Sequence, residues 1–397
     1  MNKHNSNAGY LFNSRRIFIS TFSLFALLMS GCSSDLPVPD GEAFTDGYRS
    51  FLPEAYCYSS YTDNGLKLIE YATMTNSSLC SKPNCSHRDQ NCIVQRLDRM
   101  APLISDGYAY YFSDSDAELY ENENGNSDLK LGSALYCWNL KNGKQKKLLR
   151  VDGYSISAYY GWLMHGGLIY YVGNGLSRYY DENHNLLSYG NSGGEMSLCM
   201  ADPVNSDTAG LCQLYDIETL KSFFPAAAQS AEAYMKGLFE NKIYFNIAFV
   251  EQGEQWEGGF IYHFYVTYYD LNDGTYHGTP VDYKHIDYAA VSFLSDDYLA
   301  ICRDGEASVY QSGTDEPVIL KDDCFYPEAE LTAFDDTVFC SGKVFDLNTR
   351  EVHEAADLNP DDPTMNAKEV IARYGDDYIV RDDALNFEKI PAEKLLN

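Results

Sequence analysis

An all-β fold is predicted by three features of this 397-residue chain. Tyrosine is unusually abundant, at 34 residues with 20 phenylalanines beside it, and aromatic side chains favour the pleated, half-buried surface of a sheet. Short turn pairs of Asx or Gly residues recur, each followed by a run of aromatic or apolar residues. Long amphipathic helical patterns are scarce, and the one segment of helical composition, 218–240, is interrupted by Pro225.

The turn pairs predict hairpins at regular places along the chain. They start at residues 106, 166, 241, 296, 335 and 376. Asn, Asp and Gly tolerate positive φ, so such pairs between strand-forming residues are typical of tight hairpin turns. A second pattern, an aromatic residue followed by Asx, an aliphatic residue and a turn, occurs at 138–143, 215–219, 269–274 and 345–349. We expect it to be the turn between the last two strands of a four-stranded unit.

The spacing of the repeat predicts a β-propeller-like domain of about seven blades. The last two intervals between turn pairs are 39 and 41 residues, the length of one blade, and the longer intervals leave room for insertions at 113–130, 173–195 and 251–259. Faces packed between blades also account for the aromatic excess. Another multi-sheet all-β array is the alternative. Trp256, within the last insertion, is the candidate ligand contact.

The N-terminal segment has the parts of a lipoprotein signal peptide. Arg15 and Arg16 precede an apolar run, 17–29, which is too short to span a bilayer, and the small residues Ser30 and Gly31 precede Cys32. These residues resemble a lipobox, which implies cleavage after residue 31 and a lipid on Cys32. An ordinary signal peptide is the alternative, and the export route, folded or unfolded, stays open. We therefore predict a signal peptide (1–31), a short tether (32–46) and a propeller-like domain (47–397).

The charge restricts the possible partners. The chain carries a net charge of −29, and loss of three basic residues with the signal peptide makes the mature chain −32. Such a surface repels nucleic acid and anionic lipid, so no nucleic acid partner is expected. The sequence instead predicts an acidic, extracytoplasmic protein of the cell envelope that meets the membrane through its lipid anchor.

Three cysteines and one histidine lie within 13 residues: Cys80, Cys85, His87 and Cys92. Three thiolates and one imidazole are a full donor set for a closed structural zinc site. Exported proteins often oxidise their cysteines, so a disulfide within the group, or one that involves Cys57, is the main alternative. Unpaired thiols are the third.

The same segment carries a family resemblance. Its spacing, Cys-x-x-Pro-x-Cys-x-His-x(4)-Cys, resembles a group of uncharacterised bacterial lipoproteins with propeller-like repeats. The resemblance is close over this segment and weak over the turn repeats. It implies a propeller-like fold and an envelope location, and it implies no activity.

No pattern nominates catalytic residues. The G-x-S-x-G match at 190–194 lacks the strand-turn-helix context of a nucleophile elbow, so we interpret it as a hairpin loop. The sequence thus favours a membrane-anchored binding or scaffolding module whose ligand is a glycan, a peptide or another envelope protein. A carbohydrate-active propeller enzyme with paired carboxylates is the alternative.

Overall fold

The computed structural model describes residues 43–45, 49–60, 65–80, 85–87, 92–97, 102–113, 118–121, 127–130, 132–180, 186–215, 227–239, 241–251, 262–278, 283–285, 290–295, 298–303, 306–311, 317–321, 332–334, 337–340, 342–358 and 368–395. All of them belong to one compact unit, Pro39–Asn397. The signal peptide and Cys32 lie outside the described residues.

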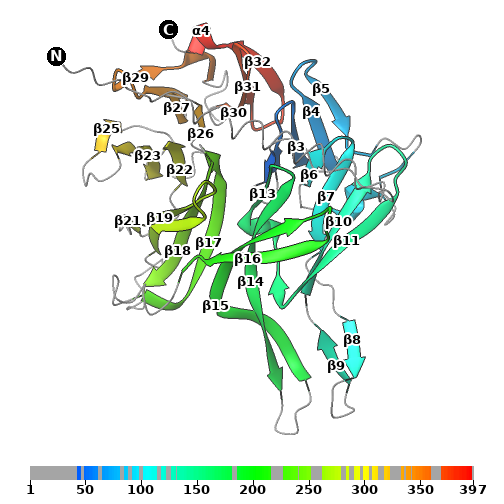
Figure 1. The fold of residues 1–397 in the computed structure, drawn as a ribbon. Helices are drawn as coiled ribbons and strands as arrows, with labels where there is room; N and C mark the ends of the chain where they lie inside the picture. Colours follow the sequence, from blue (N-terminus) through cyan, green and yellow to red (C-terminus); the bar gives the residue numbers. More distant parts are fainter. Residues whose placement is uncertain are drawn as a thin grey trace, which may run out of the picture. The chain divides into compact units, whose positions relative to one another are not determined.

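The described strands form seven successive antiparallel groups, here sheets 1 to 7 (Figure 1). Sheet 1 contains β2 (Arg49–Phe51), β3 (Ala55–Ser60), β4 (Gly65–Glu70) and β5 (Thr75–Ser78). Sheet 2 contains β6 (Leu103–Ser105), β7 (Tyr108–Ser113), β10 (Gly132–Asn139) and β11 (Gln145–Asp152). Sheet 3 contains β13 (Trp162–His165), β14 (Leu168–Tyr180), β15 (Leu186–Asp202) and β16 (Asp207–Gln213), with β12 (Tyr154–Ser155) paired to β14.

The later sheets repeat this arrangement. Sheet 4 contains β17 (Ala227–Phe239), β18 (Lys242–Glu251), β19 (Tyr262–Asp270), β20 (Thr275–Gly278) and β21 (Tyr283–His285). Sheet 5 contains β22 (Ala290–Ser295), β23 (Tyr298–Arg303), β24 (Glu306–Gln311) and β25 (Pro317–Lys321). Sheet 6 contains β26 (Thr332–Phe334), β27 (Thr337–Cys340), β28 (Lys343–Asp346) and β29 (Glu351–Glu354). Sheet 7 contains β30 (Glu369–Tyr374), β31 (Asp377–Arg381) and β32 (Phe387–Pro391).

Seven consecutive sheets confirm the predicted propeller-like all-β fold. Each turn pair of the first pattern lies between the first and second strands of a sheet, as at Asp106-Gly107 between β6 and β7. The short helical elements are α2 (Ile93–Arg96), η1 (Ala158–Tyr160), η2 (Ala356–Leu358) and α4 (Ala392–Leu395). None of the helices in the described residues is long and apolar enough to cross a membrane.

The antiparallel order gives every sheet two different ends. The turn between strands one and two and the turn between strands three and four lie at one end, which we name the turn end. The link between strands two and three and the crossover to the next sheet lie at the opposite end, which we name the connection end. In sheet 2, Leu140 N donates to Gly107 O at 2.9 Å, and in sheet 4, Leu271 N donates to Asn241 O at 2.8 Å. Within each of these sheets, the two turns of the turn end therefore lie side by side.

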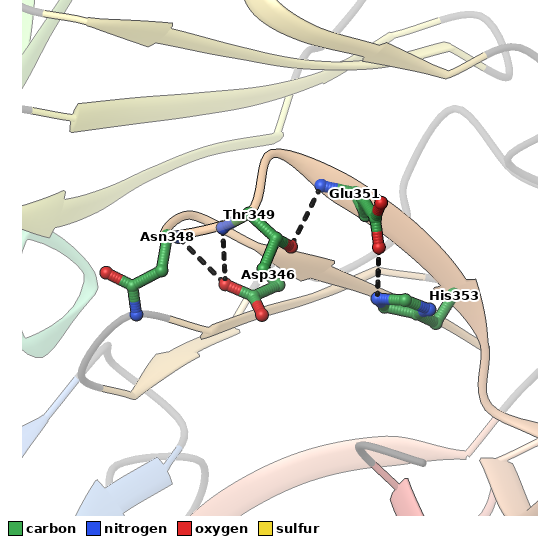
Figure 2. A network of polar contacts seen from close by, with 5 residues as sticks. All are labelled: Asp346, Asn348, Thr349, Glu351 and His353. Atoms are coloured by element: carbon green, nitrogen blue, oxygen red, sulfur yellow. Dashed lines mark hydrogen bonds and ion pairs between the residues drawn. The ribbon is translucent and has the colours of Figure 1, made fainter.

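The second sequence pattern is explained by side-chain caps at the turn end. Asp346 Oδ1 accepts from the backbone N–H of Asn348 (2.8 Å) and Thr349 (3.1 Å) between β28 and β29 (Figure 2). Asn139 Oδ1 does the same for Lys141 and Asn142 between β10 and β11. The Asx residue therefore recurs because it satisfies turn N–H groups that no strand partner reaches.

One copy of that pattern was placed wrongly. Tyr215 follows the last strand of sheet 3, and the turn between β15 and β16 is formed instead by residues 203–206, capped by Asp202. The hydroxyl of Tyr215 donates to Ala231 O at 2.5 Å, so this residue joins sheet 3 to sheet 4. The described part of the helix-like segment, Ala227–Phe239, is also a strand, because its odd residues Ala231, Ala233 and Met235 bury one face against sheet 3.

The long segments lie at the connection end. The 113–130 insertion is the link between β7 and β10 and includes the hairpin β8 (Glu118–Glu121) and β9 (Ser127–Lys130). The 173–195 insertion extends β14 and β15 into a long hairpin (Figure 1). Gly190 and Asn191 pair with Ser177 and Leu176, and the register then shifts, so 190–194 lie within β15 rather than in the predicted loop. The third insertion links β18 to β19, and its residues 252–261, which include Trp256, lie outside the described residues.

Aromatic and aliphatic side chains pack successive sheets together. Phe112 of sheet 2 lies 5.2 Å from Trp162 and 4.8 Å from Tyr171 of sheet 3, measured between ring centroids. Sheet 7 packs on sheet 1, where Phe387 lies 5.2 Å from Tyr58. The last sheet in the chain thus contacts the first.

A short strand precedes sheet 1. β1 (Ala43–Thr45) pairs with β13 on one side and with β2 on the other, and so joins sheets 1 and 3. It lies within the segment assigned as a tether, so strand pairing begins inside that segment.

Candidate functional site

The Cys/His segment forms the crossover from sheet 1 to sheet 2, at the connection end. Leu79, buried after β5, donates its N–H to Leu66 O at 3.0 Å and fixes the chain where the segment begins. Cys80 follows directly, and its N–H lies 3.4 Å from Ser78 Oγ. Cys92 comes immediately before α2, which packs on β4.

The structure brings all four predicted side chains together. The ligand atoms of Cys80, Cys85, His87 and Cys92 lie within 4.8 Å of one another. Cys92 Sγ is 3.7 Å from His87 Nδ1. Cys92 is buried, and the other three are half-buried. Burial, together with the neighbouring thiols of Cys80 and Cys85, raises the pKa of Cys92.

The donor set and its geometry fit a tetrahedral zinc ion. With Zn–S near 2.3 Å and Zn–N near 2.0 Å, a sulfur and a nitrogen on one tetrahedral zinc lie about 3.5 Å apart. The 3.7 Å between Cys92 Sγ and His87 Nδ1 is close to that separation. Three sulfurs and one nitrogen also fill all four positions, so the group has the composition of a closed, structural site.

A close backbone approach supports the cluster. A Cβ on Gly65, at the start of β4, would lie 2.1 Å from Val94 Cγ1 on α2. Only glycine allows α2 to sit this close to the sheet. His87 adopts a positive φ of 55°, which turns the chain between Cys85 and Cys92. The segment is therefore shaped locally to converge its donors.

The remaining described cysteines do not extend the site. Cys57 and Cys137 are buried in strands. Cys199 lies opposite Gly210, and Cys212 lies opposite Leu198, so the two thiols point to opposite faces of sheet 3. Both carry free thiols. Cys57 carries a thiol, which leaves the disulfide alternative without support at this residue.

A second cluster, of tyrosine rings, was not predicted from the sequence. Tyr159 and Tyr160, on the crossover from sheet 2 to sheet 3, pack on Tyr234 of β17. Tyr159 is 51% exposed, whereas Trp162, close by in the chain, is buried between sheets. The only local signal was a Tyr-Tyr-Gly sequence before a strand, which does not distinguish a surface ring from a core ring.

No family model and no curated protein matches the chain. Solved structures match the chain at low similarity. YjhT matches with 13% identity and a TM-score of 0.36, over 81% of this chain and 99% of that one. TolB from Acinetobacter baumannii matches with 10% identity and a TM-score of 0.25, over 92% and 65% of the two chains. Dipeptidyl peptidase 4 from Porphyromonas gingivalis matches with 10% identity and a TM-score of 0.38, over 87% and 53%. This chain therefore spans about half the length of that peptidase.

Proposed function

We propose that this protein is a lipid-anchored binding module of the cell envelope, that its connection end carries the binding surface, and that Zn²⁺ on the Cys/His cluster stiffens that end. The observation that carries the proposal is the unequal distribution of chain between the two ends of the sheets. Each of the three insertions of sheets 2, 3 and 4 joins the second strand of its sheet to the third, which is a link of the connection end. In repeat folds, insertions on one face commonly form the binding face.

The membrane anchor is proposed from the N-terminal sequence. A lipid on Cys32 and the short segment up to β1 would hold the domain close to a bilayer. Metabolic labelling with a palmitate analogue tests this step. We expect label on the wild-type protein and none on Cys32→Ser. Label on both, or on neither, contradicts the lipoprotein assignment.

Zinc is proposed as a structural ion. It would cross-link the crossover after β5 to the start of α2 and so fix a 24-residue connection, 79–102, whose described residues contain only the short helix α2. Closed Cys₃His sites supply folding energy and leave no position open for catalysis.

Metal analysis of the full chain purified in detergent distinguishes the three states of the cluster. We expect one zinc per chain, with three thiols that react with a thiol reagent only after chelation. A chain without metal that is about 2 Da lighter than its reduced form would show a disulfide, at odds with the zinc assignment. A chain without metal whose thiols all react would contradict it too.

Capture from native membranes after mild crosslinking tests the binding role. Recovery of one protein, or of one class of glycan, in near-equal amount to the chain supports a binding module. An empty capture, together with hydrolysis of a glycan by the purified chain, would favour the enzymatic alternative.

A further inference from the structure

We infer that Tyr159, Tyr160, Tyr234, Glu232 and Asn174 form a subsite for a sugar ring of a neutral oligosaccharide. The inference rests on the proposed binding function, because it names the ligand class and places it at the connection end.

The apolar part of the subsite is a group of three tyrosine rings. The centroid of Tyr159 lies 5.5 Å from that of Tyr160 and 5.4 Å from that of Tyr234, with interplanar angles of 69° and 81°. Tyr160 and Tyr234 are 5.8 Å apart. These edge-to-face contacts hold the exposed Tyr159 ring in a defined orientation, so a ligand that stacks on it finds a fixed platform.

Tyr159 is unusual among the large apolar side chains. Within the described residues, Tyr159 and Val204 are the exposed ones, at 51% and 44%. Val204 lies in the β15–β16 turn, at the turn end of sheet 3. Tyr159 lies at the connection end, in η1, which contacts β17. Its ring is thus presented where the long connections lie.

Hydrogen-bond acceptors surround the rings. Tyr234 donates its hydroxyl proton to Glu232 Oε2, and Glu232 is itself exposed. Burial and then the Glu232 carboxylate raise the pKa of Tyr160 to about 12, so this hydroxyl stays protonated near neutral pH. The same hydroxyl contacts the side-chain amide of Asn174. The hydroxyls, amide and carboxylate therefore converge beside the platform.

Two of the acceptors have no donor. Asn174 is 8% exposed, and its Oδ1 has no hydrogen-bond partner within the described part of the chain. Asn246 lies directly opposite Tyr234 in the β17–β18 ladder and is 4% exposed. Its Oδ1 also accepts no hydrogen bond from the described residues. Buried acceptors without donors are costly, and they commonly mark a functional site. Both Oδ1 atoms are enclosed, and the exposed carboxylate of Glu232 is the acceptor that a ligand with hydroxyl donors reaches directly.

A sugar ring meets both requirements. One face of a pyranose presents C–H groups that stack on an aromatic ring, and its edge carries several hydroxyl donors. A cation held in an aromatic cage is the competing occupant. The three rings are in mutual contact, with no centroid separation above 5.8 Å, and so leave no space between them for an ammonium group. The negative charge of the chain and of Glu232 in turn disfavours an anionic glycan.

Titration of the full chain with chitohexaose, cellohexaose and maltohexaose, followed by calorimetry, tests the inference. We expect one of these probes to bind, and Tyr159→Ala to weaken it by at least about tenfold. Tyr159→Phe keeps the ring, so its saccharide Kd should stay within about threefold of wild type. This variant tests the subsite where the alanine variant folds poorly. Val204→Ala, which truncates the exposed side chain at the turn end, should leave binding unchanged.

The outcomes separate this inference from the binding role. Glu232→Gln keeps an acceptor oxygen, so saccharide binding should survive it and should persist in about 0.5 M salt. A cationic peptide that binds instead, and is lost with Glu232→Gln or with salt, overturns the saccharide assignment and leaves a binding module. Saccharide binding with the same affinity in wild type and Tyr159→Ala contradicts the proposed subsite and leaves saccharide as the ligand class. If no hexaose binds, the saccharide inference fails. If the membrane capture is also empty, the proposed binding function fails as well.

Discussion

The turn end and the connection end of the sheets are built from the same strands by opposite means. At the turn end, residues such as Asn139, Asp202 and Asp346 cap short turns with their own side chains. At the connection end, the links are long and differ from sheet to sheet. The turn end repeats one kind of capped turn. The connection end carries the Cys/His cluster and the exposed tyrosine cluster.

The difference separates stability from recognition. A capped turn satisfies its own N–H groups within about five or six residues, so it needs no help from neighbouring sheets. The crossovers from sheet 1 to sheet 2 and from sheet 2 to sheet 3 have few strand partners and must be ordered by something else. Side-chain convergence does this twice, through Cys80, Cys85, His87 and Cys92 and through packing of Tyr159 on Tyr234. We expect changes at the connection end to alter metal or ligand binding, and changes at the turn end to alter stability alone.

The largest effect is expected from Cys92→Ser. Loss of one thiolate should reduce bound zinc from one per chain to near zero. At free zinc about 1,000-fold above its Kd, binding contributes about 4 kcal/mol to stability, which the variant loses. Metal analysis and a thermal melt with and without chelator measure both. Cys212→Ser removes a half-buried thiol from sheet 3 and is the matched control. Equal zinc in both variants would exclude Cys92 as a ligand.

An intermediate effect is expected from Gly65→Ala. The added methyl would lie 2.1 Å from Val94 Cγ1, so α2 must move, and overpacking of this kind costs about 1–3 kcal/mol. Because Cys92 precedes α2 directly, zinc affinity should fall as well. Gly210→Ala, where a Cβ meets nothing within 4 Å, is the control. Addition of Val94→Ala should restore zinc affinity to Gly65→Ala, and failure to do so would contradict the steric link.

The smallest effect is expected at the turn end. Burial opposes ionisation of Asp346, but hydrogen bonds from the backbone of Thr349 and Asn348 outweigh it and hold its pKa below the ordinary value. Asp346→Ala should cost about 1 kcal/mol in urea unfolding and leave zinc unchanged. Asp346→Asn should be near neutral, since Asn139 caps the same turn in sheet 2.

The pH dependence of that turn has a defined sign. A lowered folded-state pKa stabilises the protein above the unfolded pKa, and the contribution is lost as pH falls through the folded value. Wild-type stability should therefore fall more than that of Asp346→Asn below about pH 4. Parallel acid curves for the two proteins would show that the carboxylate contributes nothing.

The sequence predicted the turn end better than the connection end. Turn pairs of Asx or Gly residues are local signals, so the hairpins at 106, 166 and 376 were placed correctly. The copy at 215–219 was placed wrongly because its first residue, Tyr215, contacts the next sheet and does not begin a turn between strands. The helix-like Ala227–Phe239 misled because burial against sheet 3 outweighs the helical preference of alanine.

At the connection end, only the close spacing of metal-ligand residues along the sequence was informative. Four metal-ligand residues within 13 positions can converge without help from the rest of the fold, so the cluster was predictable. The tyrosine cluster was not, because Tyr159 and Tyr234 are 75 residues apart and meet only through packing of the crossover on β17. In a chain with 34 tyrosines, no local pattern distinguishes these rings from core rings.

Site-specific photocrosslinking in the native membrane tests the central claim most directly, because it traps a ligand of any chemical class. A photoreactive phenylalanine analogue is placed at position 159, at the connection end, or at position 204, at the turn end. Both sites are exposed in the wild-type protein, so neither substitution should disturb the core. We expect a discrete adduct from position 159 and none from position 204. Adducts from position 204 alone, or equal adducts from both, would contradict it.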